Sequence, residues 1–110
     1  MNELLRIHPE VQAALSDGTA VVALESTITT HGLPRPDNLE AARMSESAVR
    51  EAGAVPATIA VNDGRLLVGL TDEELVELAD VRDIPKVSRQ NLAGVLAGPW
   101  TPASCASASA

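Results

Sequence analysis

The chain has 110 residues, a formal net charge of −7 and 45% hydrophobic residues, with one Trp and no Phe or Tyr. This length is enough for one small domain, whose core must be built from aliphatic side chains, as in layered α/β folds. The acidic balance argues against a nucleic-acid-binding protein, because such proteins need a basic face.

Two further features concern the location of the protein. The sequence has no apolar run long enough to span a membrane, and its N-terminus lacks the charged-then-apolar order of a signal peptide. The single cysteine, Cys105, cannot form an internal disulfide, which fits a reducing compartment. We therefore expect a cytoplasmic protein that does not bind membranes.

The first half of the chain is predicted to form a helix, a strand and a second helix. Pro9 suits the first position of a helix, because the missing N–H is not needed there. The apolar run 21–24 predicts a strand that is buried on both faces. Asp37 and Glu40 have the spacing of a capping box, which predicts a helix that continues to about Ala52.

The second half begins with a predicted β-hairpin. Its strands are residues 57–61 and 66–70, and the intervening Asn-Asp-Gly-Arg sequence is typical of a tight turn. Thr71 and Glu74 form a second capping-box pattern, which predicts a helix directly after the hairpin. A last helix is expected from Gln90 to about residue 97.

The composition changes after this last helix. From Trp100 onward the chain contains only small or polar uncharged residues, apart from that Trp itself, and it has no periodicity. Residues 98–110 are therefore predicted to be a low-complexity, disordered tail that follows the folded residues 1–97. The predicted order α-β-α-β-β-α-α has too few strands to cover its central apolar ones, which indicates an incomplete sheet and the first part of a larger α/β domain.

A polar loop follows the first predicted strand, and it is the first place to look for chemistry. Glu25 stands where the strand ends, and hydroxyl side chains follow it at once. Ligands of open α/β sheets bind outside the carboxyl ends of the strands, where a partly buried carboxylate can act as a general acid or base. The same residue types also fit an ordinary loop, in which Glu25 is solvated and the hydroxyls satisfy the turn.

Two other places carry candidate binding residues. His31 could donate to a substrate or carry a proton, or it could bond its local backbone as many loop histidines do. Lys86 and Arg89, with Ser88 between them, could hold a phosphate near the start of the last helix, or they could form a solvated face. The two histidines and the scattered carboxylates do not have the spacing of a metal site.

Several segments in series resemble the pseudouridine-5′-phosphate glycosidase family, also called the indigoidine synthase A-like family. The resemblance covers roughly residues 8–97 in unbroken order. The most distinctive matching strings are ALESTI at 23–28, HGLP at 31–34, GAVPATIAV at 53–61 and KVSR at 86–89. The resemblance implies an α/β/α sandwich, of which this chain is the N-terminal portion with an incomplete sheet, and assembly as a homotrimer.

The resemblance also implies a reaction. Members of this family reversibly cleave the C–C bond of pseudouridine 5′-phosphate to give uracil and ribose 5-phosphate. They open the ribose ring and form a Schiff base between a lysine and the sugar, and the resulting iminium accepts electrons while uracil is protonated and leaves. A divalent metal, usually Mn²⁺, helps to organise the site.

Family roles can be transferred only to matching positions. Glu25 matches the proton donor, and Lys86 matches a lysine that contacts the substrate phosphate or ribose. Ser88, Arg89 and His31 lie in matching motifs and are given supporting roles in substrate binding. The Schiff-base lysine and the metal-binding aspartate belong to a part of the family that has no match here, since the resemblance ends near residue 97. The chain is therefore expected to be inactive alone, and no Mn²⁺ ligand is identified in it.

Two other functions stay open at this point. The chain could be a sugar-phosphate-binding module that does not turn its ligand over. It could also be an interaction protein whose partial sheet joins a full-length homologue. Saturable binding of ribose 5-phosphate would favour the first, and co-purification with a homologue would favour the second.

Overall fold

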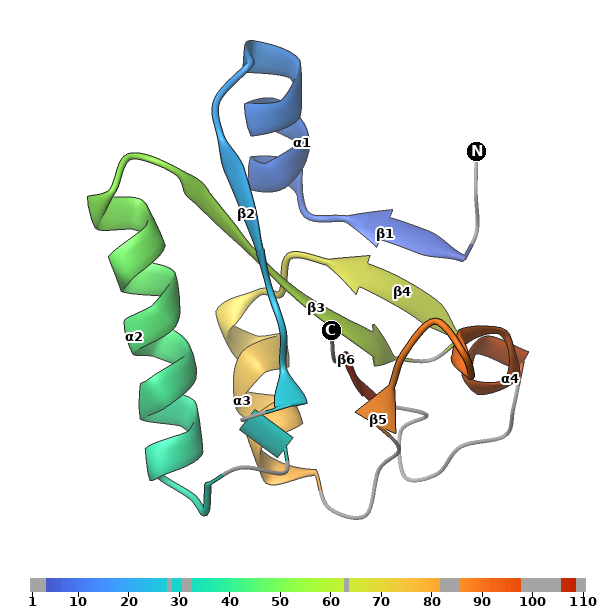
Figure 1. Ribbon diagram of the computed structural model, residues 1–110. Helices are drawn as coiled ribbons and strands as arrows, with labels where there is room; N and C mark the ends of the chain where they lie inside the picture. The colour runs from blue at the N-terminus through green and yellow to red at the C-terminus, as the bar shows by residue number, and fades with distance from the viewer. Residues whose placement is uncertain are drawn as a thin grey trace.

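The computed structural model describes residues 4–27, 29–30, 33–62, 64–81, 86–97 and 106–108. They form a mixed α/β fold in which helices pack around a six-stranded sheet (Figure 1). In chain order the elements are β1 (Leu5–Ile7), α1 (Pro9–Asp17), β2 (Val21–Leu24), α2 (Asp37–Glu51), β3 (Val55–Asn62), β4 (Arg65–Val68), α3 (Asp72–Asp80), β5 (Lys86–Val87), α4 (Leu92–Ala97) and β6 (Ala106–Ala108).

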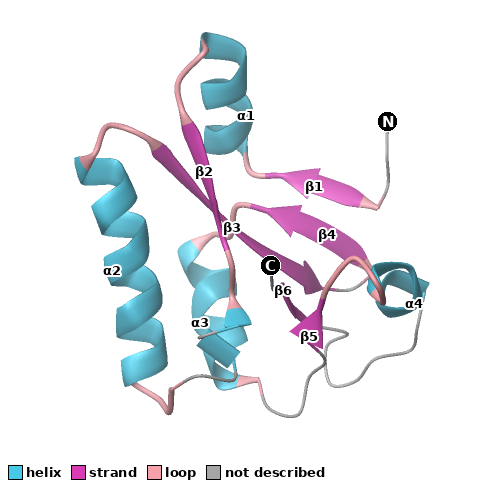
Figure 2. Cartoon of the chain, viewed as in Figure 1, coloured by secondary structure: helices cyan, strands magenta, loops and turns pink. Residues whose placement is uncertain are grey.

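Strand β3 is the centre of the sheet, whose order is β1-β4-β3-β6-β5 with β2 also paired to β3 (Figure 2). It pairs with β2 in parallel, with Leu24 opposite Thr58, and with β4 and β6 in antiparallel fashion. Its residues are mostly buried, and Ala57 and Val61 are fully so. This burial is typical of a central strand, and β3 includes the predicted strand 57–61.

Helices cover both faces of the sheet. Neighbouring residues of a strand point to opposite faces, so Ala60 and Val61 mark the two sides of β3. Ala60 packs with Leu78 of α3, whereas Val61 packs with Val95 of α4. The arrangement confirms an α/β fold with helical layers on both sides of the sheet.

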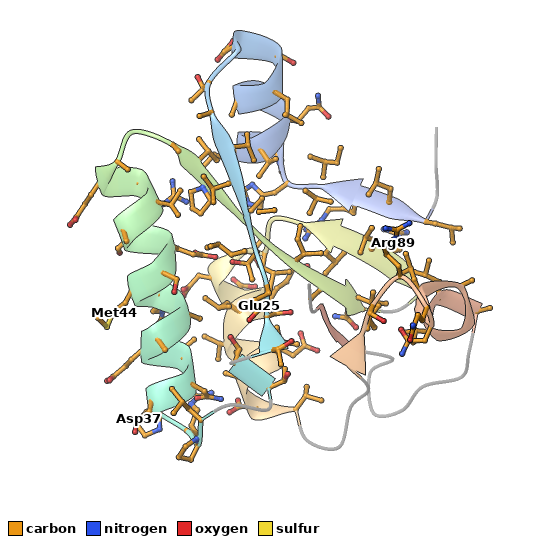
Figure 3. The ribbon with its side chains drawn as sticks, in the orientation of Figure 1. Glu25, Asp37, Met44 and Arg89 are labelled. Atoms are coloured by element: carbon orange, nitrogen blue, oxygen red, sulfur yellow. The ribbon has the colours of Figure 1, made fainter. Side chains whose placement is uncertain are left out.

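Helix α2 packs over α3 through a small aliphatic stripe. Leu39 and Ala42 of α2 are buried with Leu75 and Ala79 of α3. Met44 lies on the outer face of α2, where it is 72% exposed and points away from the sheet (Figure 3). The helix therefore has the one-sided pattern expected of an amphipathic surface helix.

The two predicted capping boxes have different outcomes. At α3, the Thr71 hydroxyl accepts from the Glu74 N–H at 3.0 Å, and the Glu74 carboxylate accepts from the Thr71 N–H at 2.8 Å, which confirms the prediction. At α2, the capping box is wrong, because Asp37 is already helical and Pro36 precedes it without a side-chain cap. The Glu40 N–H donates instead to the Pro36 carbonyl at 3.1 Å, and the Leu39 N–H donates to the Asn38 side-chain oxygen at 2.8 Å.

The hairpin is confirmed, with Asn62 opposite Arg65, but β2 differs from its prediction. Val22 is 39% exposed and Ala23 is exposed as well, so the strand is not buried on both faces. In the described part of the chain β2 pairs with β3 alone, and an edge strand of this kind keeps one side open.

Three strands were not predicted. Strand β1 adds to β4 in parallel, while β5 and β6 complete the other edge of the sheet. Residues 106–108, where the sequence predicts disorder, form β6 between β3 and β5, and the rest of 98–110 lies outside the described residues. Strand pairing uses backbone groups, so a segment without large side chains can still join a sheet.

The last helix begins at Leu92 instead of Gln90. The N–H groups of Asn91 and Leu92 both donate to the Ser88 carbonyl, at 3.2 and 3.0 Å, so a turn precedes the helix. No helix in the described ranges is long and apolar enough to cross a bilayer.

Candidate functional site

Glu25 lies directly after β2 at the carboxyl end of that strand, as the sequence predicts. Its side chain is exposed and lines a cavity of about 230 Å³ between β2, β3 and α2. Figure 3 shows Glu25 at the end of β2, on the side of the sheet where α2 and α3 lie. The cavity is lined by Leu24, Glu25, Thr29, Ala42, Ser45 and Thr58.

The loop that carries Glu25 is held in place by buried polar groups. The Ser26 hydroxyl is fully buried and donates to the Ile59 carbonyl of β3 at 2.6 Å. The Asn38 side-chain amide is buried too, and it donates to the carbonyls of Thr29 and Ala79 at 2.9 Å each. These bonds tie the loop to β3, α2 and α3, so the position of Glu25 is defined by the core of the fold.

A second carboxylate, Glu46, lies next to this cavity and was not selected from the sequence. It projects from α2, is half-buried, and accepts a hydrogen bond from the Thr58 hydroxyl at 2.6 Å. Thr58 itself is 3% exposed and lines the cavity. One signal could have revealed Glu46, because it falls on the same helical face as Leu39 and Ala42, where an apolar residue is expected.

The structure does not bring all the predicted binding residues to Glu25. Arg89 is exposed and lies beside α4, well away from Glu25 (Figure 3). Ser88 is half-buried, and its N–H donates to the Asn91 side chain at 2.8 Å. Helix α4 has six residues and begins at Leu92, so its dipole adds little to a phosphate site at Ser88.

Two predicted residues cannot be placed in full. The backbone of Lys86 belongs to β5 and pairs with Ser107 of β6, but its side chain lies outside the described residues. His31 also lies outside the described residues. Their roles stay predictions.

A second cavity of about 230 Å³ lies around Arg6 and Arg65. The Arg6 guanidinium donates to Glu74 at 2.7 Å and to the Gly69 carbonyl at 2.9 Å, so its charge is already compensated. Burial acts to raise the pKa of Glu74, but the bond from the Thr71 N–H and the Arg6 charge outweigh it and hold that pKa below its ordinary value. We interpret the Arg6–Glu74 pair as a structural contact that holds β1 against α3.

The described residues do not fit a metal site. Within those ranges the chain brings together no group of three His, Cys, Asp or Glu side chains that could hold an ion. The Mn²⁺ implied by the resemblance stays a prediction, and we assign it no ligands among these residues.

Comparison with known protein families identifies the lineage. The family model described as indigoidine synthase A like protein matches residues 10–110. The chain belongs to this family. The match of the family model runs past residue 97, where the resemblance was expected to end, to residue 110.

Relatives in this family include proteins named pseudouridine-5′-phosphate glycosidase. The one from Rhodospirillum centenum is 59% identical over 97 residues, which are 88% of this chain and 30% of the relative. The one from Arabidopsis thaliana is 49% identical over 98 residues, again 88% of this chain and 30% of the relative. The chain thus spans about 30% of the length of the curated relatives that it matches.

Two solved structures share this fold. The prealnumycin C-glycosynthase AlnA, crystallised with ribulose 5-phosphate, superposes with a TM-score of 0.82 at 38% identity, covering 99% of this chain and 33% of the other. An indigoidine synthase A-like protein from Thermotoga maritima gives a TM-score of 0.73 at 27% identity, covering 96% and 32%.

Proposed function

We propose that the chain carries the proton-donor part of a site that acts on the C–C glycosidic bond of pseudouridine 5′-phosphate. The observation that carries the proposal is the position of Glu25, a carboxylate at a strand end that lines a cavity of about 230 Å³. The relatives named pseudouridine-5′-phosphate glycosidase support the substrate. The neighbour that was crystallised with ribulose 5-phosphate supports a phosphosugar.

In this proposal Glu25 moves a proton. When the bond between uracil and the sugar breaks, its electron pair stays on the uracil carbon, which takes a proton from the Glu25 carboxyl, and water supplies the hydroxyl that the sugar carbon gains in ribose 5-phosphate. In the reverse direction the same carboxylate takes the proton back. Because the Glu25 side chain is exposed, it is open to a ligand that enters the cavity.

The phosphate or ribose of the substrate is assigned to Lys86, with supporting contacts from Ser88, Arg89 and His31. Lys86 is the only lysine of the 110 residues. If it contacts the phosphate or ribose, as the resemblance implies, the chain has no second lysine for a Schiff base. We therefore expect the chain to bind the substrate without turning it over. No step is assigned to Mn²⁺, because the described residues offer no ligand set for it.

A binding experiment tests the phosphosugar site. Purified protein is titrated with ribose 5-phosphate by calorimetry, and we expect saturable binding that Lys86→Ala abolishes. Arg65→Ala, which removes an exposed positive charge at the other cavity, is the matched control and should bind like the wild type. Absence of binding by the wild-type protein would contradict the proposal.

A second experiment tests the absence of turnover. The protein is incubated with pseudouridine 5′-phosphate and Mn²⁺, and uracil release is compared with that of Glu25→Ala. We expect no release above this control. Release above it would show that the chain has its own nucleophile, and Lys86 would be the first residue to test.

An oligomer-forming role is the second candidate, and the exposed apolar side chains of β2 favour it. Val22 and Ala23 leave apolar surface open on an edge strand. In this role the chain associates with copies of itself, as a homotrimer, or with a full-length homologue. Light scattering after size-exclusion chromatography distinguishes these outcomes from a monomer, and Val22→Lys should shift the protein toward the monomer.

A further inference from the structure

The hydrogen bond between Thr58 and Glu46 fixes the direction of a hydroxyl beside Glu25. A threonine hydroxyl has one proton to donate and lone pairs that accept, whereas an ionised carboxylate only accepts. At 2.6 Å from Glu46 Oε2, the Thr58 proton is committed to the carboxylate. Thr58 lines the cavity, so it can offer only an acceptor to a ligand there.

The Ser45 hydroxyl also uses its proton in a hydrogen bond within the protein. Its hydroxyl donates to the Ala41 carbonyl, one helical turn earlier in α2, at 3.0 Å. It lines the same cavity, so its remaining capacity is again that of an acceptor. Glu25 adds a carboxylate to the wall that Thr58 and Ser45 form, and among the lining residues that the structure describes none is a cation.

From this wall we infer that the cavity is a subsite for hydrogen-bond donors, meaning the hydroxyl or N–H groups of a neutral part of the ligand. Glu46 is the positioning residue that keeps Thr58 in its accepting orientation. A phosphate has oxygens that need donors, so it is disfavoured in this cavity by the acceptors and by the charge of Glu25. This inference rests on the proposed function, and it assigns the sugar hydroxyls or the base N–H groups to the cavity and the phosphate to another place.

Two probes test the chemical class of the ligand. We expect D-ribose, which carries hydroxyls and no charge, to shift the NMR signals of Thr58 and Ser45 in a saturable way. Inorganic phosphate should leave both signals unchanged at the same concentrations. Phosphate that shifts them as strongly as ribose would overturn the inference.

Variants test the roles of the two residues with ribose 5-phosphate as the ligand. Thr58→Val keeps the shape of the side chain but removes the acceptor, and we expect its Kd to rise about five- to tenfold. Thr58→Ser keeps the hydroxyl and should stay within about twofold of the wild type. An unchanged Kd in Thr58→Val would overturn the role of Thr58 while leaving the proposed function intact.

Glu46→Gln tests the positioning role. Because Glu46 acts through Thr58, the double variant Glu46→Gln with Thr58→Val should bind no more weakly than Thr58→Val alone. Glu51→Gln, an exposed carboxylate on the same helix, is the matched control and should leave the Kd unchanged. Additive losses in the double variant would overturn the positioning role, whereas a wild-type protein that binds no ribose 5-phosphate would instead contradict the proposed function.

Discussion

Arg6 and Glu74 lie 68 positions apart in the chain and form an ion pair at 2.7 Å that joins β1 to the first turn of α3. Glu74 also closes the capping box with Thr71, so one carboxylate serves two elements. Glu74→Ala removes both functions, and we expect the free energy of unfolding to fall by about 1–3 kcal/mol. Glu74→Gln keeps the capping geometry and should cost less. Urea denaturation measures the free energy of unfolding of both variants. Equal losses in Glu74→Ala and Glu74→Gln would show that the capping geometry adds nothing.

The acid sensitivity of the fold should depend on the same residue. The pKa of Glu74 in the folded state lies below its ordinary value of 4.5, so the folded state favours the ionised form. This stabilisation is present above about pH 4.5 and is lost as the pH falls through the lowered folded-state pKa. Glu74→Gln should therefore flatten the fall in stability below pH 4.5. A Gln variant with the same acid profile as the wild type would rule out this contribution.

The ion pair between Arg50 and Glu10 offers a contrast, because it is more exposed. Two hydrogen bonds of 2.6 and 2.9 Å join the side chains, which are 49% and 42% exposed. The bond from Arg50 lowers the pKa of Glu10, but water and salt screen the pair. Arg50→Ala should cost less than about 1 kcal/mol, and this cost should shrink further in high salt. A larger loss that salt leaves unchanged would contradict this expectation.

Gly69 should not tolerate a side chain. Its φ is +90°, and an added Cβ would lie 2.8 Å from Val11 Cγ2 and 2.9 Å from His8 Cβ. Gly69→Ala therefore combines backbone strain with a clash against α1, and we expect a loss of about 2 kcal/mol or more. Gly18→Ala is the control, because its φ is +76° but no atom lies within 4 Å of the added Cβ. Thermal unfolding should rank the Gly69 variant well below the Gly18 variant.

The buried amide of Asn38 should be needed for the loop that carries Glu25. Its side-chain N–H groups donate to the carbonyls of Thr29 in the loop and of Ala79 in α3. Asn38→Asp replaces the donor by an oxygen, which leaves two carbonyls unpaired and adds a charge beside them. We expect a loss of about 2–4 kcal/mol and altered NMR signals of Glu25. Unchanged Glu25 signals in a folded Asn38→Asp protein would show that the loop is held by other contacts.

The sequence predicted the elements with strong local signals and missed those that depend on distant partners. The Thr71 and Asp37 capping boxes look alike in sequence, yet only the first forms, because the chain reaches Asp37 already in helical geometry. Strand β1 has three residues, too few for a hydrophobic pattern, and it exists because β4 offers an open edge. Burial of β2 was overestimated because its sequence carries no information on which neighbours cover it.

The candidate site was predicted in the same uneven way. Glu25 was found because a carboxylate at the end of an apolar strand is a local signal, and the structure places it at a cavity. Glu46 was missed because only its hydrogen bond to Thr58 connects it to the cavity. That bond forms when α2 packs on β3, which the sequence does not show. Ser88 and Arg89 were grouped with Lys86 by their spacing and by the resemblance, and Arg89 lies away from Glu25 in the structure (Figure 3).

Strand β6 lies inside the sheet although it comes last in the chain. It separates β3 from β5, and the backbone of Lys86 pairs with Ser107. A chain made from its N-terminus presents β3 and β4 long before residues 106–108 appear. The hairpin and α3 can therefore assemble early, whereas the strand that carries Lys86 gains its sheet neighbour only when β6 has been synthesised. The acid at residue 25 and the lysine at residue 86 thus reach their positions at different stages of biosynthesis.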